Sequence, residues 1–291
     1  MIDLVLDDLR AAAGIGVAGN FAGHLEQAGE AADFAGVVAA SAEAPKGIFP
    51  WYLPGDEGFL GVFPLSHDLL SRPAGDVNLQ IEPEAGLVCA VSYGDDGRAD
   101  SLAPVALAAF NDCSIRRPGA AKISHKKNWG PASKGIARRV FPVTDLAPGG
   151  PTATLRLACL LRRGGRAHEY GIDSPLRGYS YYGARLLEWI AGRLRDQAGA
   201  DDSPLEPVGE YLVAAGRPPT LVVGIGATRY TPFGEGTFLE PGDESLVIVY
   251  DASATTPADV REAVARGGED HLPRASVLRQ VVRGTAEGAG A

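Results

Sequence analysis

Short apolar segments bounded by glycine or proline run through residues 75–250, and this pattern constrains the fold more than any other. The chain has 38 glycines and 21 prolines among its 291 residues, and both residue types interrupt regular structure and form turns. One long helix is predicted over Tyr182 to Gln197, where leucine and isoleucine recur at helical spacing. The predicted class is mixed and mostly β, with short helices and one longer inserted helix. The predicted strands are Leu79 to Tyr93, Ala153 to Leu161, Leu221 to Ile225 and Ser245 to Tyr250, while Leu102 to Phe110 fits a strand or a helix.

Composition excludes several classes of protein. With 45% hydrophobic and 22% charged residues the chain is not intrinsically disordered. Its net charge of −9 argues against binding to nucleic acid or to an anionic membrane surface. No apolar run is long enough for a membrane span. Three cysteines without a CxxC pair, and a start that lacks a basic signal region, favour a reducing cytoplasm.

Positive charge is concentrated in one stretch. From Cys113 to Thr144 the sequence holds no aspartate or glutamate, yet it contains eight lysines and arginines and His125. Such a segment in an acidic chain favours a local anion site. Pairing with carboxylates elsewhere in the chain, or a solvated face, explains it equally well. The basic residues are Arg116, Arg117, Lys122, Lys126, Lys127, Lys134, Arg138 and Arg139.

Three carboxylates are candidate metal ligands. Glu82 and Glu84 lie two residues apart at the start of a predicted strand, so both side chains point to one face. Asp112 follows the next apolar segment and would complete an all-oxygen ligand set. Such a set suits Mg²⁺ or Mn²⁺, and Ca²⁺ also accepts it. The alternative for the glutamate pair is a solvated strand edge.

A glycine-rich turn leads to a histidine. Gly14 to Asn20 has the pattern of a strand that breaks into a turn, and Phe21 to Ala32 then has the composition of a short helix carrying His24. An imidazole in this position can serve a cavity, or it can be an ordinary hydrogen-bonded side chain.

Five short motifs, in the same order and with similar spacing, resemble those of the fumarylacetoacetate hydrolase superfamily. The resemblance covers about residues 16–250. The motifs are Gly16 to His24 (a Gly-x-Asn-Tyr-x-x-His turn), Glu82-Pro83-Glu84, Phe110 to Arg116 (Asn-Asp-x-Ser-x-Arg), Trp129 to Gly135, and Thr231 to Gly236 with Leu239 to Asp243.

The resemblance implies a β-roll core, a divalent metal and a small anionic substrate such as a 2-oxo acid. By motif position, Glu82, Glu84 and Asp112 would bind the metal, and His24 and Lys134 would be catalytic. The same matching assigns Arg116, Thr231 and Asn20 to the substrate. The implied domains are 1–70, an N-terminal lead-in with strands; 71–252, the metal-binding β-roll core; and 253–291, a helix opened by Thr256-Pro257 and a frayed tail.

Two departures separate this chain from the family pattern. Gln27 stands where a glutamate often pairs with the histidine, so its catalytic contribution would be hydrogen bonding without charge. Arg117 replaces an aspartate after Arg116. The predicted function is a metal-dependent hydrolase or lyase for an oxo-carboxylate. The alternative is a non-catalytic scaffold homologue or an anion-binding module.

Two further expectations concern surfaces. The resemblance and the apolar stripe of the long helix predict a homodimer, with Tyr181, Tyr182 and Trp189 packing either in an interface or in the core. Lys126 and Lys127 are adjacent in the sequence, and we expect them to form a solvated pair.

Overall fold

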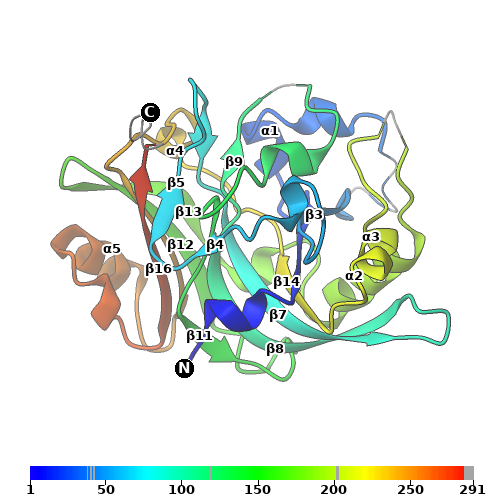
Figure 1. The fold of residues 1–291 in the computed structure, drawn as a ribbon. Coiled ribbons are helices and arrows are strands. Elements are labelled where there is room, and N and C mark those ends of the chain that lie inside the picture. Colours follow the sequence, from blue (N-terminus) through cyan, green and yellow to red (C-terminus); the bar gives the residue numbers. More distant parts are fainter. Residues whose placement is uncertain (38, 40, 42, 118, 201–202, 285–291) are drawn as a thin grey trace.

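Two large sheets and a two-stranded ribbon form the framework of the chain (Figure 1). The computed structural model describes residues 1–284, with the exception of residues 38, 40, 42, 118, 201 and 202. Within this part of the chain one sheet has nine strands and the other has five. The predicted mixed, mostly β class is confirmed.

The nine-stranded sheet contains the strands that carry the candidate site. Its central hairpin joins β7 and β8 in antiparallel register, with Pro83 opposite Asn111. Next to β7 lies β14, which runs parallel to β2. The strands are β1 (Ile2–Asp3), β11 (Arg139–Pro142), β8 (Ala99–Asn111), β7 (Pro83–Tyr93), β14 (Thr220–Gly224), β2 (Ala13–Ala18) and β3 (Gly47–Tyr52), with β10 (Lys134–Ile136) and β4 (Leu65–Ser66) beside β8. The ambiguous segment Leu102 to Phe110 is therefore a strand.

The five-stranded sheet contains a strand that was not predicted. Residues 275–283, expected to belong to a helical C-terminal region, form β16 and pair with β15. This segment has the alternating burial typical of a strand with one covered face. The order is β13 (Arg166–Pro175), β12 (Leu155–Arg163), β15 (Glu244–Asp251), β16 (Ala275–Arg283) and β5 (Leu69–Ser71), and the separate ribbon joins β6 (Leu79–Gln80) to β9 (Ser114–Ile115). The predicted frayed tail, Thr285 to Ala291, lies outside the described residues.

Helices are short, with the predicted exception. α2 (Ala184–Asp196) confirms the predicted long helix, and Leu186, Ile190 and Leu194 on its apolar face are buried. α3 (Val208–Ala214) packs beside it, and α5 (Pro257–Arg266) covers the outer face of the five-stranded sheet (Figure 1). The other helical elements are α1 (His24–Gln27), α4 (Pro232–Glu235), η1 (Leu6–Leu9), η2 (Ala31–Phe34), η3 (Phe59–Gly61), η4 (Ile123–Lys126), η5 (Leu176–Gly178) and η6 (Glu269–His271).

The helix predicted from Phe21 to Ala32 is two separate pieces. α1 covers only His24–Gln27, and η2 follows at Ala31. Gly23 and Gly29 have φ angles of +81° and +69°, outside the right-handed helical region. These two glycines end α1 after one turn and leave His24 at its first position.

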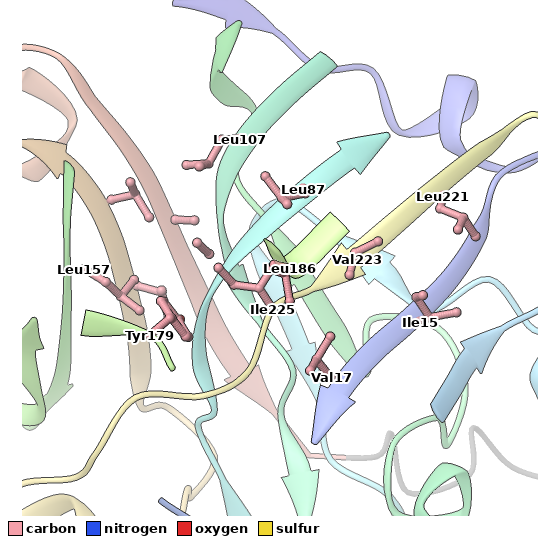
Figure 2. Packing of buried hydrophobic residues seen from close by; sticks show 14 of the residues in the cluster. Ile15, Val17, Leu87, Leu107, Leu157, Tyr179, Leu186, Leu221, Val223 and Ile225 are labelled. Carbon is pink, nitrogen blue, oxygen red and sulfur yellow. The ribbon is translucent and has the colours of Figure 1, made fainter. Parts of the chain in front are cut away.

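One apolar core joins the two large sheets (Figure 2). It includes Ile15 and Leu107 from the nine-stranded sheet, Leu157 from the five-stranded sheet and Leu186 from α2. Tyr181 is also in this core and contacts Trp189 edge to face. The packing alternative for these aromatic residues is thus observed, while the homodimer stays a prediction.

The cysteines and the helices were also the subject of expectations from the sequence. All three cysteines are buried and unpaired. None of the helices described combines the length and the apolar character that crossing a bilayer would demand.

Close contact between β2 and β3 depends on Gly14, and this generates a prediction. A Cβ atom at Gly14 would lie 2.2 Å from the Trp51 ring. We expect Gly14→Ala to lower the free energy of unfolding by about 1–3 kcal/mol, because the buried ring must shift. Gly192 in α2 has open space around its Cα, so Gly192→Ala should raise that free energy by about 0.5–1 kcal/mol. Urea unfolding measures both, and equal behaviour of the two variants would contradict the packing argument.

Candidate metal and anion site

Three carboxylates meet at the open end of the β7–β8 hairpin, where β7 begins and β8 ends. Glu82 directly precedes β7, Glu84 is its second residue, and Asp112 directly follows β8. The Asp112 N–H donates to the Glu82 carbonyl at 3.0 Å, which ties the two strand ends together. One oxygen from each carboxylate lies within 4.8 Å of the others. The three residues are 4%, 2% and 0% exposed, so the solvated-edge alternative is wrong.

Cationic side chains contact every oxygen of Glu82 and Asp112. Glu82 Oε1 lies 2.8 Å from Arg116 Nη1, and Glu82 Oε2 lies 2.6 Å from Lys127 Nζ. The same Lys127 nitrogen lies 2.6 Å from Asp112 Oδ2. Lys134 Nζ lies 2.5 Å from Asp112 Oδ1. Lys127 therefore bridges two of the three carboxylates.

The expectation of a solvated lysine pair is wrong. Lys126 and Lys127 are both 2% exposed. Lys126 Nζ lies 2.8 Å from Glu30 Oε1 and 3.1 Å from Asp33 Oδ2. Both ammonium groups are buried because carboxylates distant in the sequence compensate their charge.

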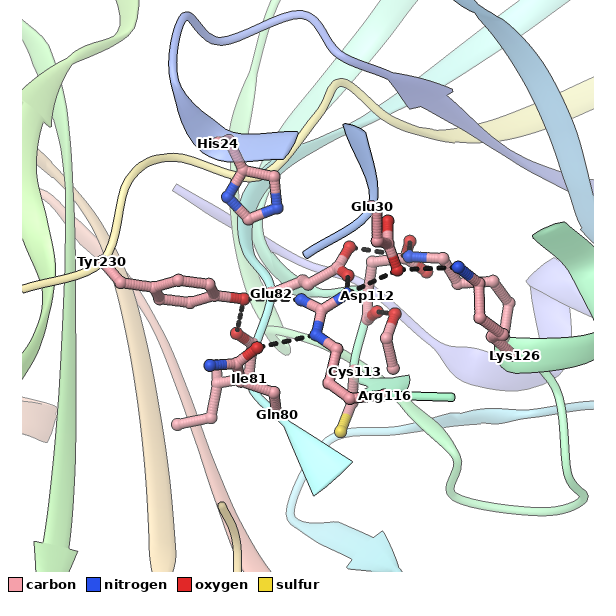
Figure 3. Close-up of polar contacts among 12 residues, drawn as sticks. His24, Glu30, Gln80, Ile81, Glu82, Asp112, Cys113, Arg116, Lys126 and Tyr230 are labelled. Atoms are coloured by element: carbon pink, nitrogen blue, oxygen red, sulfur yellow. Dashed lines mark hydrogen bonds and ion pairs between the residues drawn. The ribbon is translucent and has the colours of Figure 1, made fainter. Parts of the chain in front are cut away.

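Arg116 connects several groups of the site (Figure 3). Its Nη1 lies 2.8 Å from both Glu30 Oε1 and Glu82 Oε1, and its Nε donates to Gln80 at 2.6 Å. Its Nη2 donates to the Tyr230 hydroxyl at 2.8 Å, and that hydroxyl donates to the Ile81 carbonyl at 2.8 Å. Three of these contacts are hydrogen bonds, donated by Nε, Nη1 and Nη2, so they use three of the five guanidinium N–H groups. The predicted substrate contact of Arg116 would have to use one of the two that remain.

The glutamates of the triad differ in their electrostatics. Burial alone would raise the pKa of Glu82, but Lys127 and Arg116 outweigh it and hold that pKa well below its usual range. Burial raises the pKa of Glu84 strongly, and the neighbouring charges of Asp112 and Glu82 raise it further. In the described part of the chain Glu84 has no ion-pair partner, and its Oε2 accepts a hydrogen bond from the Gly226 N–H at 2.9 Å.

Gly224, the last residue of β14, and Gly226 make room for Glu84. A Cβ atom at Gly224 would lie 2.5 Å from Glu84 Oε2. Gly226 has a φ of +110° and directs its N–H toward the same oxygen. The Gly224-Ile225-Gly226 sequence is therefore a local signal of this site.

The donor set fits a divalent cation. Three buried carboxylates supply the hard oxygen ligands that Mg²⁺, Mn²⁺ or Ca²⁺ prefer. Glu84 is repelled by the other two carboxylates and lacks a cationic partner among the described residues, so a cation here would stabilise its charged form. Lys127 already contacts the two remaining ligands.

His24 lies beside the triad as a neutral imidazole. Its Nδ1 is 2.9 Å from the Thr228 carbonyl oxygen, which requires the proton on Nδ1 and leaves Nε2 unprotonated. Burial lowers the pKa of His24 to about 4. The ring centroid lies 5.2 Å from that of Tyr230. His24, Glu82, Glu84 and Lys127 line a cavity of about 20 Å³, which has room for about one water molecule.

Three predicted site residues contact main-chain groups instead of this cavity. The Gln27 side chain accepts from the Tyr230 N–H at 2.9 Å and donates to its carbonyl at 3.2 Å, and so positions Tyr230. The Asn20 amide bonds to the main chain of Tyr181 and Ile225. Thr231 caps α4. None of the three lines the cavity.

Sequence reasoning missed three residues of the site. Glu30 is an acidic neighbour of Gln27 in the sequence, and it pairs with Arg116 and Lys126. Lys127 could not be distinguished from Lys126 by its local sequence. Tyr230 directly precedes the Thr231 motif, and its hydroxyl binds Arg116.

Comparisons with known proteins bear on the fold. A profile of the family of unknown function DUF5718 matches residues 30–282. A search of curated proteins gives no match. The structure of Cg1458 with inhibitor is similar, with a TM-score of 0.56, 13% identity, and coverage of 94% of this chain and 77% of that chain. So is 5-carboxymethyl-2-hydroxymuconate delta-isomerase from Mycobacterium smegmatis, with a TM-score of 0.53, 15% identity, and coverage of 95% and 80%.

At these identities the similarity concerns the fold alone. It confirms the fumarylacetoacetate hydrolase-like fold that the five motifs predicted. It leaves the roles of individual residues to the geometry of this chain.

The buried neutral state of His24 predicts a pH dependence of stability. An unfolded chain takes up a proton near the ordinary pKa of 6.5, whereas folded His24 stays neutral down to about pH 4. The free energy of unfolding should therefore fall between about pH 6.5 and pH 4, with a His24 share of about 3 kcal/mol.

Denaturant unfolding at several pH values checks this. His24→Asn should flatten the pH dependence in that window, because its amide can still donate to Thr228 but does not titrate. His271→Asn, at an exposed histidine, should leave it unchanged. The same pH dependence in wild type and His24→Asn would rule out a buried neutral imidazole.

Proposed function

The chain belongs to the DUF5718 family, whose function is unknown, and we propose that it is an enzyme acting on a small oxo-carboxylate with one divalent metal ion. The proposed chemistry is hydrolysis or lyase chemistry through an enolate: C–C bond cleavage, decarboxylation or a related reaction. The proposed ion is Mg²⁺ or Mn²⁺.

The observation that carries this proposal is the buried triad of Glu82, Glu84 and Asp112, with ligand oxygens within 4.8 Å. A chain seldom buries three carboxylates together without a function for their charge. The surrounding cations support an anionic substrate, because Arg116 and two lysines lie within 2.8 Å of triad oxygens.

A divalent ion held by these three residues would supply a Lewis acid for the negative charge that develops on a keto oxygen. The unprotonated Nε2 of His24 can accept a proton or hold a water molecule beside the triad. Lys134 contacts Asp112 and the Cys113 carbonyl oxygen. It would hold Asp112 in position and add a positive charge next to the triad. Gln27 contributes by positioning Tyr230 against Arg116.

Substrate entry requires a rearrangement. A cavity of about 20 Å³ cannot contain an oxo-carboxylate. Its lining includes His24, Leu25, Glu30 and Phe34, which all belong to the short α1–η2 region. Movement of this region away from β7 would open the cavity to solvent.

The same observation favours a second candidate, a non-catalytic homologue that keeps the scaffold. In it the four cations Arg116, Lys126, Lys127 and Lys134 would serve only to compensate buried carboxylates. The absence of Mg²⁺-dependent turnover on acylpyruvates and oxaloacetate would favour this candidate.

Metal binding is the first test of the proposed function. Calorimetry should detect one Mn²⁺ or Mg²⁺ ion at concentrations up to about millimolar. Asp112→Asn should weaken binding at least tenfold, because it removes one ligand charge. Asp95→Asn, in an exposed turn, should have no effect. A wild-type protein that binds neither ion at millimolar concentration contradicts the proposed metal dependence.

Lys134 is expected to be required for turnover. On a substrate that the wild type converts, Lys134→Met should lower kcat/KM by about 100-fold, because the charge that supports Asp112 is deleted. Arg138→Met, in the same basic stretch but exposed, should keep the wild-type value. Steady-state kinetics decide this, and full activity of Lys134→Met would show that the motif match assigned the wrong lysine.

A further inference from the structure

We propose that Lys127 is a resident cation of the acidic site, and that a divalent ion must displace its ammonium group before the triad can bind it. This inference rests on the proposed function, since it concerns the same three carboxylates. It makes Lys127 the residue that sets the metal affinity of this chain.

The Lys127 ammonium group lies between two carboxylates of the triad. Lys127 Nζ lies 2.6 Å from Glu82 Oε2 and 2.6 Å from Asp112 Oδ2. The other oxygens of these two carboxylates contact Arg116 and Lys134. No oxygen of Glu82 or Asp112 is therefore free of a cationic contact, and the group between the two carboxylates is the Lys127 ammonium.

The other two cations of the site each contact one triad residue. Arg116 contacts only Glu82 of the triad, and Lys134 contacts only Asp112. Of these three cations, Lys127 is the one that contacts two triad residues. A divalent cation held by both carboxylates would compete with this ammonium, because two positive charges repel each other strongly in a buried site.

Contacts of neighbouring residues hold the backbone next to Lys127. It is the first residue after η4, and its ammonium also lies 5.0 Å from the centroid of the Phe49 ring. η4 is fixed independently of Lys127, since the Ser124 hydroxyl donates to Glu206 at 2.8 Å and Lys126 pairs with Glu30. Displacement of the Lys127 side chain from the triad would therefore leave these contacts of η4 intact.

It follows that Lys127 stabilises the site without metal and weakens metal binding. Removal of its charge should raise the affinity for Mn²⁺ by about tenfold or more, the size of one charge-assisted contact. The same removal should lower the stability of the metal-free protein, because Glu82 and Asp112 then lack their shared cation.

The experiment measures Mn²⁺ binding by calorimetry and thermal unfolding with and without Mn²⁺, for wild type, Lys127→Met and Lys127→Gln. Lys126→Met is the matched control, because Lys126 is equally buried but pairs with Glu30 and Asp33 outside the triad. We expect tighter Mn²⁺ binding by both Lys127 variants, a lower Tm without Mn²⁺, and recovery of Tm with it. The control should bind Mn²⁺ as the wild type does.

The outcomes separate this inference from the proposed function. Binding by Lys127→Met but not by wild type supports the inference and refutes metal dependence of the natural chain. Equal affinity of wild type and Lys127→Met overturns the inference and leaves the proposed metal dependence intact. Folded variants that bind no Mn²⁺ overturn the inference as well. So does failure of both Lys127 variants to fold at millimolar Mn²⁺, since the ion should replace the missing charge.

Discussion

The compensation of buried carboxylates by lysine and arginine side chains is the interaction on which the rest of this structure depends. Moving such groups out of water costs several kcal/mol for each charge unless opposite charge is placed beside them. β7 and β8 place the carboxylates at one hairpin end, and β10 and the residue after η4 supply Lys134 and Lys127. α1 and η2 then close the site with His24 and Glu30. Several short elements thus meet at the site, because each supplies a charged side chain or shields one from solvent.

The balance of charge also explains the basic stretch between Cys113 and Thr144. Four of its cations, Arg116, Lys126, Lys127 and Lys134, pair with carboxylates of the site or next to it, as the internal-pairing interpretation predicted. Others, such as Arg138 and Arg139, are exposed. Among the triad carboxylates Glu84 is not compensated in this way. The proposed divalent ion would therefore add the most stabilisation at Glu84, whereas at Glu82 and Asp112 it would compete with Lys127.

The fold of this chain is shared with proteins of low sequence identity. The chain shares its fold with structures to which it is 13–15% identical, because strand order and core packing tolerate extensive substitution when volume and pattern are kept. The site is less tolerant, since each change of charge alters the balance. Gln27, in place of the glutamate that the family resemblance implies, would be a change of this kind. The roles of individual site residues therefore rest on the geometry of this chain.

The sequence by itself determined the strands β7, β12, β14 and β15, the long helix and the acidic triad. Strand alternation brings Glu82 and Glu84 to one face, helical periodicity defines α2, and both are properties of neighbouring residues. The motif order also predicted the fold. Only the tertiary structure decided which lysine reaches the triad, that Glu30 joins it, and that residues 275–283 extend a sheet. Lys127 and Glu82 are 45 residues apart, and Lys126 has the same local sequence environment as Lys127. Which of the two lysines contacts the triad depends on how η4 packs against distant segments. The partner of an ion pair is set by distance in space, and the residues next to it in the sequence do not encode that distance.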